Sequence, residues 1–70
     1  MNYIQVTSSN IKAIGYDPET MTLGVEYLNN TEYHYFDVPE DHYEGALNAD
    51  SVGTYLHNYI KGKYRFKQVR

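Results

Sequence analysis

The sequence contains no cysteine, no tryptophan and no long apolar run. The absence of cysteine excludes a disulfide framework and a zinc site with thiolate ligands. No stretch reaches the roughly 20 apolar residues that a membrane-spanning helix requires, and the mean hydropathy is only -0.68. The first residues also lack the basic and apolar regions of a signal peptide. We therefore expect a cytoplasmic protein that makes no contact with a membrane.

A chain of 70 residues is too short for two hydrophobic cores, so we expect one domain over residues 1–70. A single core of this size leaves about 3–5 kcal/mol of net stability, which makes a homo-oligomer a reasonable expectation. The composition is rich in aromatic residues, with nine Tyr and two Phe. Because a buried tyrosine hydroxyl needs a hydrogen-bond partner, these rings suit half-buried positions.

Charge is distributed unevenly along the chain. Residues 1–60 contain all nine acidic residues, whereas residues 61–70 contain five of the six basic ones. The formal net charge of -3 therefore combines an acidic body with a basic end. Such an end can bind an anion, the protein's own acidic face or another copy, and a solvated tail is the simplest alternative.

Alternating residues predict an antiparallel sheet in the first half of the chain. Residues 11–16 are typical of a strand and residues 17–20 of a turn. A second strand is predicted over residues 21–28. Four of its side chains share one face: Met21, Leu23, Val25 and Tyr27. This pattern predicts that one face of the sheet is buried.

A third strand is predicted over residues 31–38. Asn29 and Asn30 tolerate positive φ angles, so we expect a two-residue hairpin loop before it. Alternation places Tyr33 and Tyr35 on one face, about 7 Å apart. Three residues of the other face compete with them for the buried side: His34, Phe36 and Val38. We favour packing of the two tyrosines in or beside the core, and an exposed stacking platform is the alternative.

Two short helices are predicted after the strands. Pro39 is expected in the first turn of one helix, with Asp37 or Val38 near its cap. The second helix follows Ser51, and Gly62 is placed to end it. Its apolar stripe has helical spacing: Val52, Tyr55, Leu56, Tyr59 and Ile60. Residues 63–70 fit either an edge strand or an extended arm. The predicted fold class is α+β, an antiparallel meander of three to four strands followed by two short helices packed on one sheet face.

Several short motifs, taken together in order, resemble the KTSC domain family. This family occurs at the C-terminus of some lysyl-tRNA synthetases and as free-standing small proteins. The resemblance implies a sheet followed by helices, and RNA binding is the role usually suggested. The motifs cover about 60 residues: Val6-Thr7-Ser8-Ser9, Ile14-Gly15-Tyr16-Asp17, Leu23, Val25, Tyr33-His34-Tyr35, Val38-Pro39, the segment 49–56, Ile60 and Tyr64.

No arrangement in the sequence points to catalysis, a metal or a cofactor. His34, His42 and His57 lie on separate predicted elements without a ligand spacing. The serines lack the G-x-S-x-G context of a nucleophile, and Ser51 or Asp50 is expected to cap the second helix. We therefore expect a protein that is not an enzyme.

Aromatic and basic residues instead suggest a site for a ligand that carries a base and a phosphate, either RNA or a small, signalling-type nucleotide. In this hypothesis tyrosines stack, cations hold phosphate, Ser51 donates a hydrogen bond, and Gly53 either permits close backbone approach or packs between elements. The candidate residues are Tyr33, Tyr35, Ser51, Gly53, Lys61, Lys63, Tyr64, Arg65 and Lys67. The alternative is a protein-interaction or inhibitory module of a phage or bacterium that uses a tyrosine-rich surface.

Overall fold

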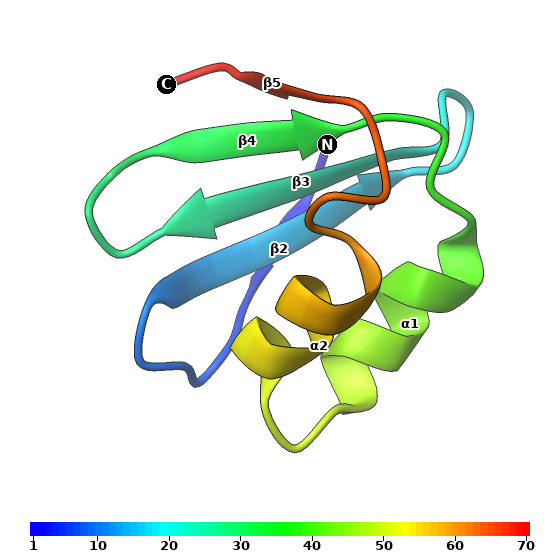
Figure 1. The fold of residues 1–70 in the computed structure, drawn as a ribbon. Helices are drawn as coiled ribbons and strands as arrows, with labels where there is room; N and C mark the ends of the chain where they lie inside the picture. Colours follow the sequence, from blue (N-terminus) through cyan, green and yellow to red (C-terminus); the bar gives the residue numbers. More distant parts are fainter.

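The protein, described over residues 1–70 by a computed structural model, is a five-stranded antiparallel sheet with two helices (Figure 1). The strands lie side by side in chain order, and both helices come between the last two strands. The elements are β1 (Tyr3–Gln5), β2 (Ile11–Asp17), β3 (Thr22–Tyr27), β4 (Glu32–Tyr35), α1 (Glu40–Asn48), α2 (Val52–Tyr59) and β5 (Phe66–Gln68). The predicted α+β fold class is confirmed, and the sheet has one strand more than expected.

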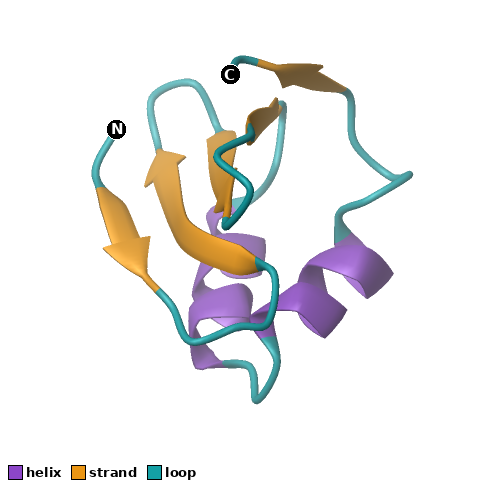
Figure 2. Cartoon of the chain, turned by 90° about the vertical axis from the view of Figure 1, so that its left-hand side faces the viewer, coloured by secondary structure: helices purple, strands orange, loops and turns teal.

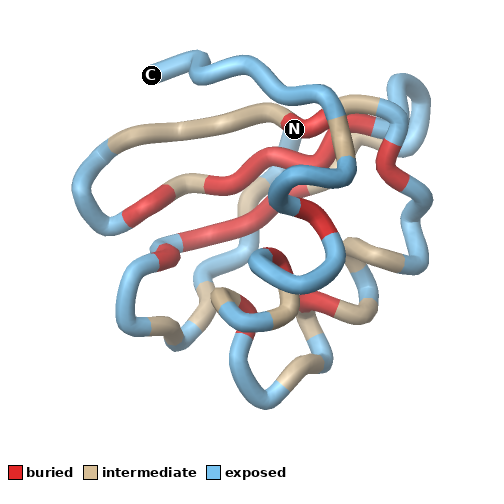
Figure 3. The backbone as a smooth tube through the Cα atoms, viewed as in Figure 1, coloured by how far each residue is buried: buried red, intermediate tan, exposed pale blue.

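Both helices cover the same face of the sheet, as the side view shows (Figure 2). Leu23 and Val25 of β3 are fully buried, and they lie opposite Tyr35 and Tyr33 of β4 in the strand register. Leu56 and other apolar side chains of the helices complete the core. The buried segments follow the central strands β2 and β3 (Figure 3). The core therefore sits between the helices and the middle of the sheet.

The turns on both sides of β3 differ from the prediction. Met21 has a φ angle of 54° and is 41% exposed, so it belongs to the turn and not to the buried face. At the other end, the Tyr27 N–H donates to the Thr31 carbonyl oxygen at 2.8 Å. This pair closes a loop of three residues ending at Asn30, whose φ angle is 70°. The hairpin therefore has the three-residue geometry with a left-handed last residue, and the expected two-residue loop was wrong.

The predicted helices form, with local differences. Pro39 is the N-cap of α1 and does not lie in its first turn. Ser51 caps α2 as expected, because its Oγ accepts from the Thr54 N–H at 3.2 Å. Tyr59 departs from the buried stripe and is 49% exposed, since its ring packs against Tyr55 at the helix surface, 4.6 Å between centroids. Neither helix is long and apolar enough to cross a membrane.

The edge strands come from the two ends of the chain. The β1 strand was not predicted, and it pairs with β2 through Tyr3 opposite Gly15. Gly24 of β3 leaves space for the Tyr3 side chain, because a Cβ at this position would collide with the Tyr3 hydroxyl. At the other edge, β5 pairs with β4, so the end of the chain forms an edge strand and not an extended arm.

Candidate functional site

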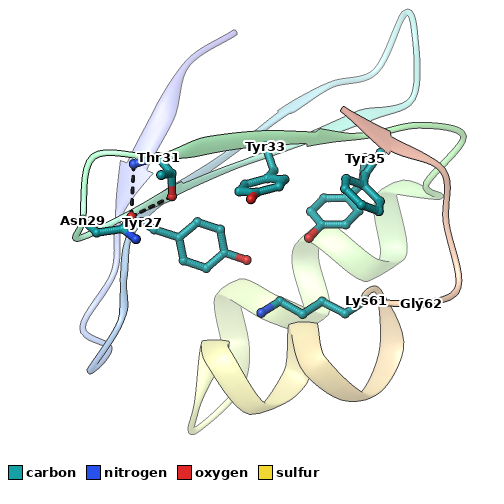
Figure 4. A pocket seen from close by; sticks show the side chains of 8 residues that line it. Tyr27, Asn29, Thr31, Tyr33, Tyr35, Lys61 and Gly62 are labelled. Atoms are coloured by element: carbon teal, nitrogen blue, oxygen red, sulfur yellow. Dashed lines mark hydrogen bonds between the residues drawn. The ribbon is translucent and has the colours of Figure 1, made fainter. Parts of the chain in front are cut away.

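An aromatic pocket of about 410 Å³ opens between the strands β3, β4 and β5 and the end of α2 (Figure 4). The strand register forms this pocket, because it places Tyr35 of β4 opposite Leu23 of β3 and also opposite Phe66 of β5. Side chains of neighbouring strands that share a face lie next to one another. The pocket residues are Tyr27, Asn29, Thr31, Tyr33, Tyr35, Lys61, Gly62 and Phe66.

Four aromatic rings form one wall of this pocket. The Tyr27 and Tyr33 rings meet edge to face, 5.7 Å between centroids. The Phe66 ring lies 5.9 Å from Tyr33 and 5.8 Å from Tyr35. Tyr35 is 5% exposed, whereas Phe66 is 56% exposed, so the wall runs from the core to the surface. Apolar ring surface is therefore available to a ligand without unfolding any element.

Burial keeps the deeper hydroxyls in their neutral form. Loss of hydration is the main cause that raises the pKa of both Tyr27 and Tyr35 above the ordinary value of 10.0. A phenol with a raised pKa stays protonated at neutral pH and can donate a hydrogen bond. These two hydroxyls point toward the same space in Figure 4. The wall is thus apolar on its rings and polar at its tips.

The charge at the pocket comes from Lys61. Its ammonium lies 5.3 Å from the centroid of the Tyr27 ring, a cation–π contact. No carboxylate lines the pocket. The neighbouring Gly62, with a φ angle of 79°, has a backbone N–H that makes no hydrogen bond in the fold. The pocket therefore combines an unpaired cation with aromatic surface, and Gly62 lines it without a side chain.

The predicted site residues fall into separate groups. Tyr33, Tyr35 and Lys61 meet at the aromatic pocket. Ser51 and Gly53 line a different, wholly polar hollow of about 230 Å³ at the start of α2. Because α2 has eight residues, the two places lie at opposite ends of a helix about 12 Å long. The Ser51 hydroxyl is already engaged in capping, and a Cβ on Gly53 would be 3.1 Å from Asn10 Oδ1, so this glycine packs closely against the loop before β2.

The remaining cationic candidates do not line the aromatic pocket. Arg65 pairs with Asp37 at 3.8 Å and lies over the Phe36 ring, 5.0 Å from its centroid. Lys67 lies opposite His34 in the register, on the face of the sheet that the helices do not cover. Lys63 is exposed in the segment between α2 and β5.

Tyr64 also lies outside the pocket. Its ring packs against the core and meets the His42 ring at 5.9 Å between centroids. The sequence-based hypothesis missed the contributions of Tyr27, Phe66 and Gly62, which line the pocket. The sequence contained an indication for Tyr27, since the alternation of residues placed it on the buried face of the sheet. It also contained one for Phe66, since this residue alternates with the basic residues at the end of the chain, a pairing of charge and aromatic rings that is typical of nucleotide binding. It contained none for Gly62, because the place of this glycine depends on how the chain returns from α2.

A second feature that the sequence did not indicate is a polar network on the uncovered sheet face. Tyr3 donates a hydrogen bond to the Glu32 carboxylate, and His34 Nε2 lies 3.3 Å from the same carboxylate. Arg70 pairs with Glu26 and also approaches Glu32 at 3.6 Å. The Tyr3 hydrogen bond is the main cause that lowers the pKa of Glu32. We call these five residues the outer-face network.

The fold and the pocket together define a small α+β domain with one aromatic concavity on the helix-covered side of its sheet. The family model of the KTSC domain matches residues 7–64, and the chain belongs to this family. The crystal structure of a KTSC domain protein from Yersinia pestis has a TM-score of 0.95, at 32% identity, over 99% of this chain and 97% of that one. The resemblance found in the sequence is thereby confirmed.

Sequence relatives include both large and small proteins. A lysine–tRNA ligase of Nostoc sp. (strain PCC 7120) is 43% identical over 61 residues, and that of Nostoc punctiforme is 39% identical over 61. Each match covers 87% of this chain and 11% of the ligase, so the chain spans about a ninth of these relatives. A protein of Stutzerimonas stutzeri is 33% identical over 70 residues, with 99% of both chains covered.

Proposed function

We propose that this chain is a non-catalytic, cytoplasmic binding domain whose aromatic pocket takes a ligand that carries a nucleobase and a phosphate. The observation that carries the proposal is the unpaired Lys61 ammonium beside a wall of four aromatic rings, in a pocket without a carboxylate. Aromatic surface and a cation are the two features that nucleobases and phosphates require of a protein.

The energetics of such a site are favourable but modest. Stacking of a base on an aromatic side chain contributes about 1–3 kcal/mol. The Tyr27 and Tyr35 hydroxyls hydrogen-bond with each other, which leaves one donor of this neutral pair for the edge of a base. A lone ammonium that is open to water contributes about 1.4 kcal/mol, a factor of ten in affinity. Binding in the micromolar to millimolar range is expected.

The relatives give independent support. Lysine–tRNA ligases contain a segment that is 39–43% identical to this chain, and an enzyme with that name acts on an RNA. A domain that recognises one nucleotide of an RNA, or a free nucleotide, fits such a setting. The acidic body of this chain opposes broad contact with RNA, so the ligand has to be recognised at the pocket itself.

The test is a pair of variants that remove the same charge from different places. Lys61→Met removes the ammonium at the pocket, and Lys67→Met removes one from the uncovered face of the sheet. Thermal shift and calorimetric titration with the four ribonucleoside monophosphates should show binding by the wild type and by Lys67→Met. Lys61→Met should bind about tenfold more weakly. Equal losses in both variants would contradict the proposal, as would a wild type that responds to none of the nucleotides.

A second candidate function is a protein-interaction or inhibitory module that uses the β5 edge. The Arg65 carbonyl accepts from the Phe36 N–H just after β4, and the Val69 N–H donates to the Glu32 carbonyl in β4. Alternation therefore directs the backbone groups of Phe66 and Gln68 away from the sheet. An extended segment with an acidic residue beside Lys67 would complement this edge. No response to nucleotides, together with a solution mass well above the 8.2 kDa of one chain, would favour this candidate.

A further inference from the structure

We infer that the aromatic pocket takes a single nucleotide unit with one bound phosphate group, free or at the end of a chain, and does not bind a run of RNA nucleotides. This inference rests on the proposed function and narrows its ligand. Three features of the fold carry it: the orientation of the rings, the contacts between them, and the placement of the cations.

The rings do not form an open stacking platform. Sheet proteins that bind single-stranded RNA present aromatic side chains on an uncovered face, where two or three successive bases stack. Here Tyr33 and Tyr35 lie on the face that α1 and α2 cover, and Tyr35 is almost fully buried. The outermost ring of the wall, Phe66, is the strongly exposed one. The pocket thus offers a base one place to stack, at Phe66 and Tyr33.

The rings also fill the space between one another. Phe66 contacts both Tyr33 and Tyr35 at less than 6 Å between centroids, and Tyr27 meets Tyr33 edge to face. None of these three contacting pairs leaves a gap wide enough for a base, because stacked rings lie about 3.5–4 Å apart and an inserted base would double that spacing. A ligand therefore packs onto the wall as one planar group, on the side that faces Lys61.

The cations do not form a track for a nucleic-acid backbone. Arg65 and Arg70 pair with carboxylates of this chain, and Lys67 lies on the opposite face of the sheet from the pocket. Lys61 is the one cation that lines the pocket. Lys63 is exposed between α2 and β5 but does not line the pocket, so a second or third phosphate would find no further cation there. Extra phosphates should therefore add little to the affinity.

This arrangement predicts the salt dependence of binding. Each phosphate of a single strand that a protein neutralises contributes a slope of about −0.7 to log K against log salt. One phosphate at Lys61 gives a slope between about −0.5 and −1, whereas a track of four cations would give about −3.

The experiment compares a nucleoside, its monophosphate, its triphosphate and a homopolymer of about ten nucleotides of the same base, by calorimetry between about 50 and 200 mM salt. The monophosphate should bind about tenfold more tightly than the nucleoside and within about threefold of the triphosphate. The homopolymer should bind no more tightly than the monophosphate, with the same shallow slope. Phe66→Ala should weaken the monophosphate at least fivefold, and Lys67→Met should leave the affinities for both the monophosphate and the homopolymer unchanged.

The possible failures are distinct. A homopolymer that binds more than about tenfold more tightly than the monophosphate, with a slope near −3 that Lys67→Met reduces, would overturn the single-unit inference and leave the proposed function standing. Binding of none of the four probes would overturn both.

Discussion

Replacement of Glu32 by glutamine is expected to loosen both edges of the sheet, because Glu32 contacts the chain at both ends. Tyr3 of β1 donates a hydrogen bond to its carboxylate, and Arg70, which follows β5, lies 3.6 Å from it. Glutamine keeps the size of the side chain and one acceptor oxygen but loses the negative charge. The charge-assisted hydrogen bond from Tyr3 then becomes an ordinary one, and Arg70 loses one of its two carboxylate partners and keeps Glu26.

The size of the effect follows from the burial of these groups. The Glu32 side chain is 17% exposed, so its hydrogen bond is screened little by water. A hydrogen bond to a charged group contributes about 1.5–3 kcal/mol, against about 0.5–1.5 kcal/mol for a neutral pair. Arg70 is exposed, so water screens its approach to Glu32 and the Tyr3 hydrogen bond dominates the effect. The expected loss is about 1–2 kcal/mol, which lowers the melting temperature of a domain of this size by about 4–16 °C.

The loss of stability in Glu32→Gln is expected to depend on pH. The pKa of Glu32 lies below the usual carboxyl value of 4.5, chiefly because of the Tyr3 hydrogen bond. A depressed carboxyl pKa adds stability above the unfolded-state value, and this stability is lost as the pH falls through the folded-state value. The difference between wild type and Glu32→Gln should therefore be constant above about pH 5.5 and should shrink as the solution becomes more acidic.

The assay is thermal unfolding followed by circular dichroism from pH 3 to pH 7, with Glu44→Gln as the matched control. Glu44 lies exposed on α1, and its carboxylate makes no hydrogen bond or ion pair, so its loss removes one charge and no contact. The reasoning fails if Glu32→Gln melts within about 1 °C of Glu44→Gln at neutral pH, or if their difference is the same at every pH.

Two further substitutions test the packing of the fold. Leu56 is 1% exposed and Tyr59 is 49% exposed on the same helix, so Leu56→Ala should cost about 2–5 kcal/mol in urea unfolding and Tyr59→Ala less than about 1 kcal/mol. Similar costs for the two would contradict the assigned core. Gly62→Ala should cost about 1–2 kcal/mol although no atom lies within 4 Å of the new Cβ, because its φ angle is 79°. Gly62→Asn should cost less than Gly62→Ala, since asparagine tolerates this conformation better, and the reverse order would refute a purely backbone cause.

The sequence predicted those parts of the fold that a repeating pattern encodes. The alternation of Leu23, Val25 and Tyr27 identified the buried face of β3 correctly, because all three side chains belong to the core cluster that also contains Leu56 of α2. The β1 strand has three residues, too few for an alternating pattern to be visible. Met21 followed the same alternation as its neighbours but lies in the turn, since sequence periodicity does not mark where a strand begins.

The candidate site was harder to predict, because it depends on strand register and on the return of the chain from α2. The spacing of Tyr33 and Tyr35 put both on one face, and their place on the core side follows from pairing with Val25 and Leu23. The same pairing puts His34 and Phe36 on the other face of the sheet. Val38 is nevertheless fully buried, because β4 ends at Tyr35 and the chain turns at Asp37, whose φ angle is 59°. The partners of Arg65 and Arg70 are residues far away in the sequence, at Asp37 and Glu26, so no local pattern could show that these charges are neutralised.

The alternation of side chains along β4 separates the aromatic pocket from the outer-face network. Tyr33 and Tyr35 face the pocket, whereas Glu32 and His34 face the outer-face network. A change in the network should therefore alter stability without altering affinity, and a change at Lys61 should do the reverse. β5 is the exception, because Phe66 forms a wall of the pocket while Arg70 joins the network two residues beyond the strand. If Glu32→Gln weakens nucleotide binding at a temperature where the variant is fully folded, the position of β5 couples the two faces, and the outer-face network controls the mouth of the pocket.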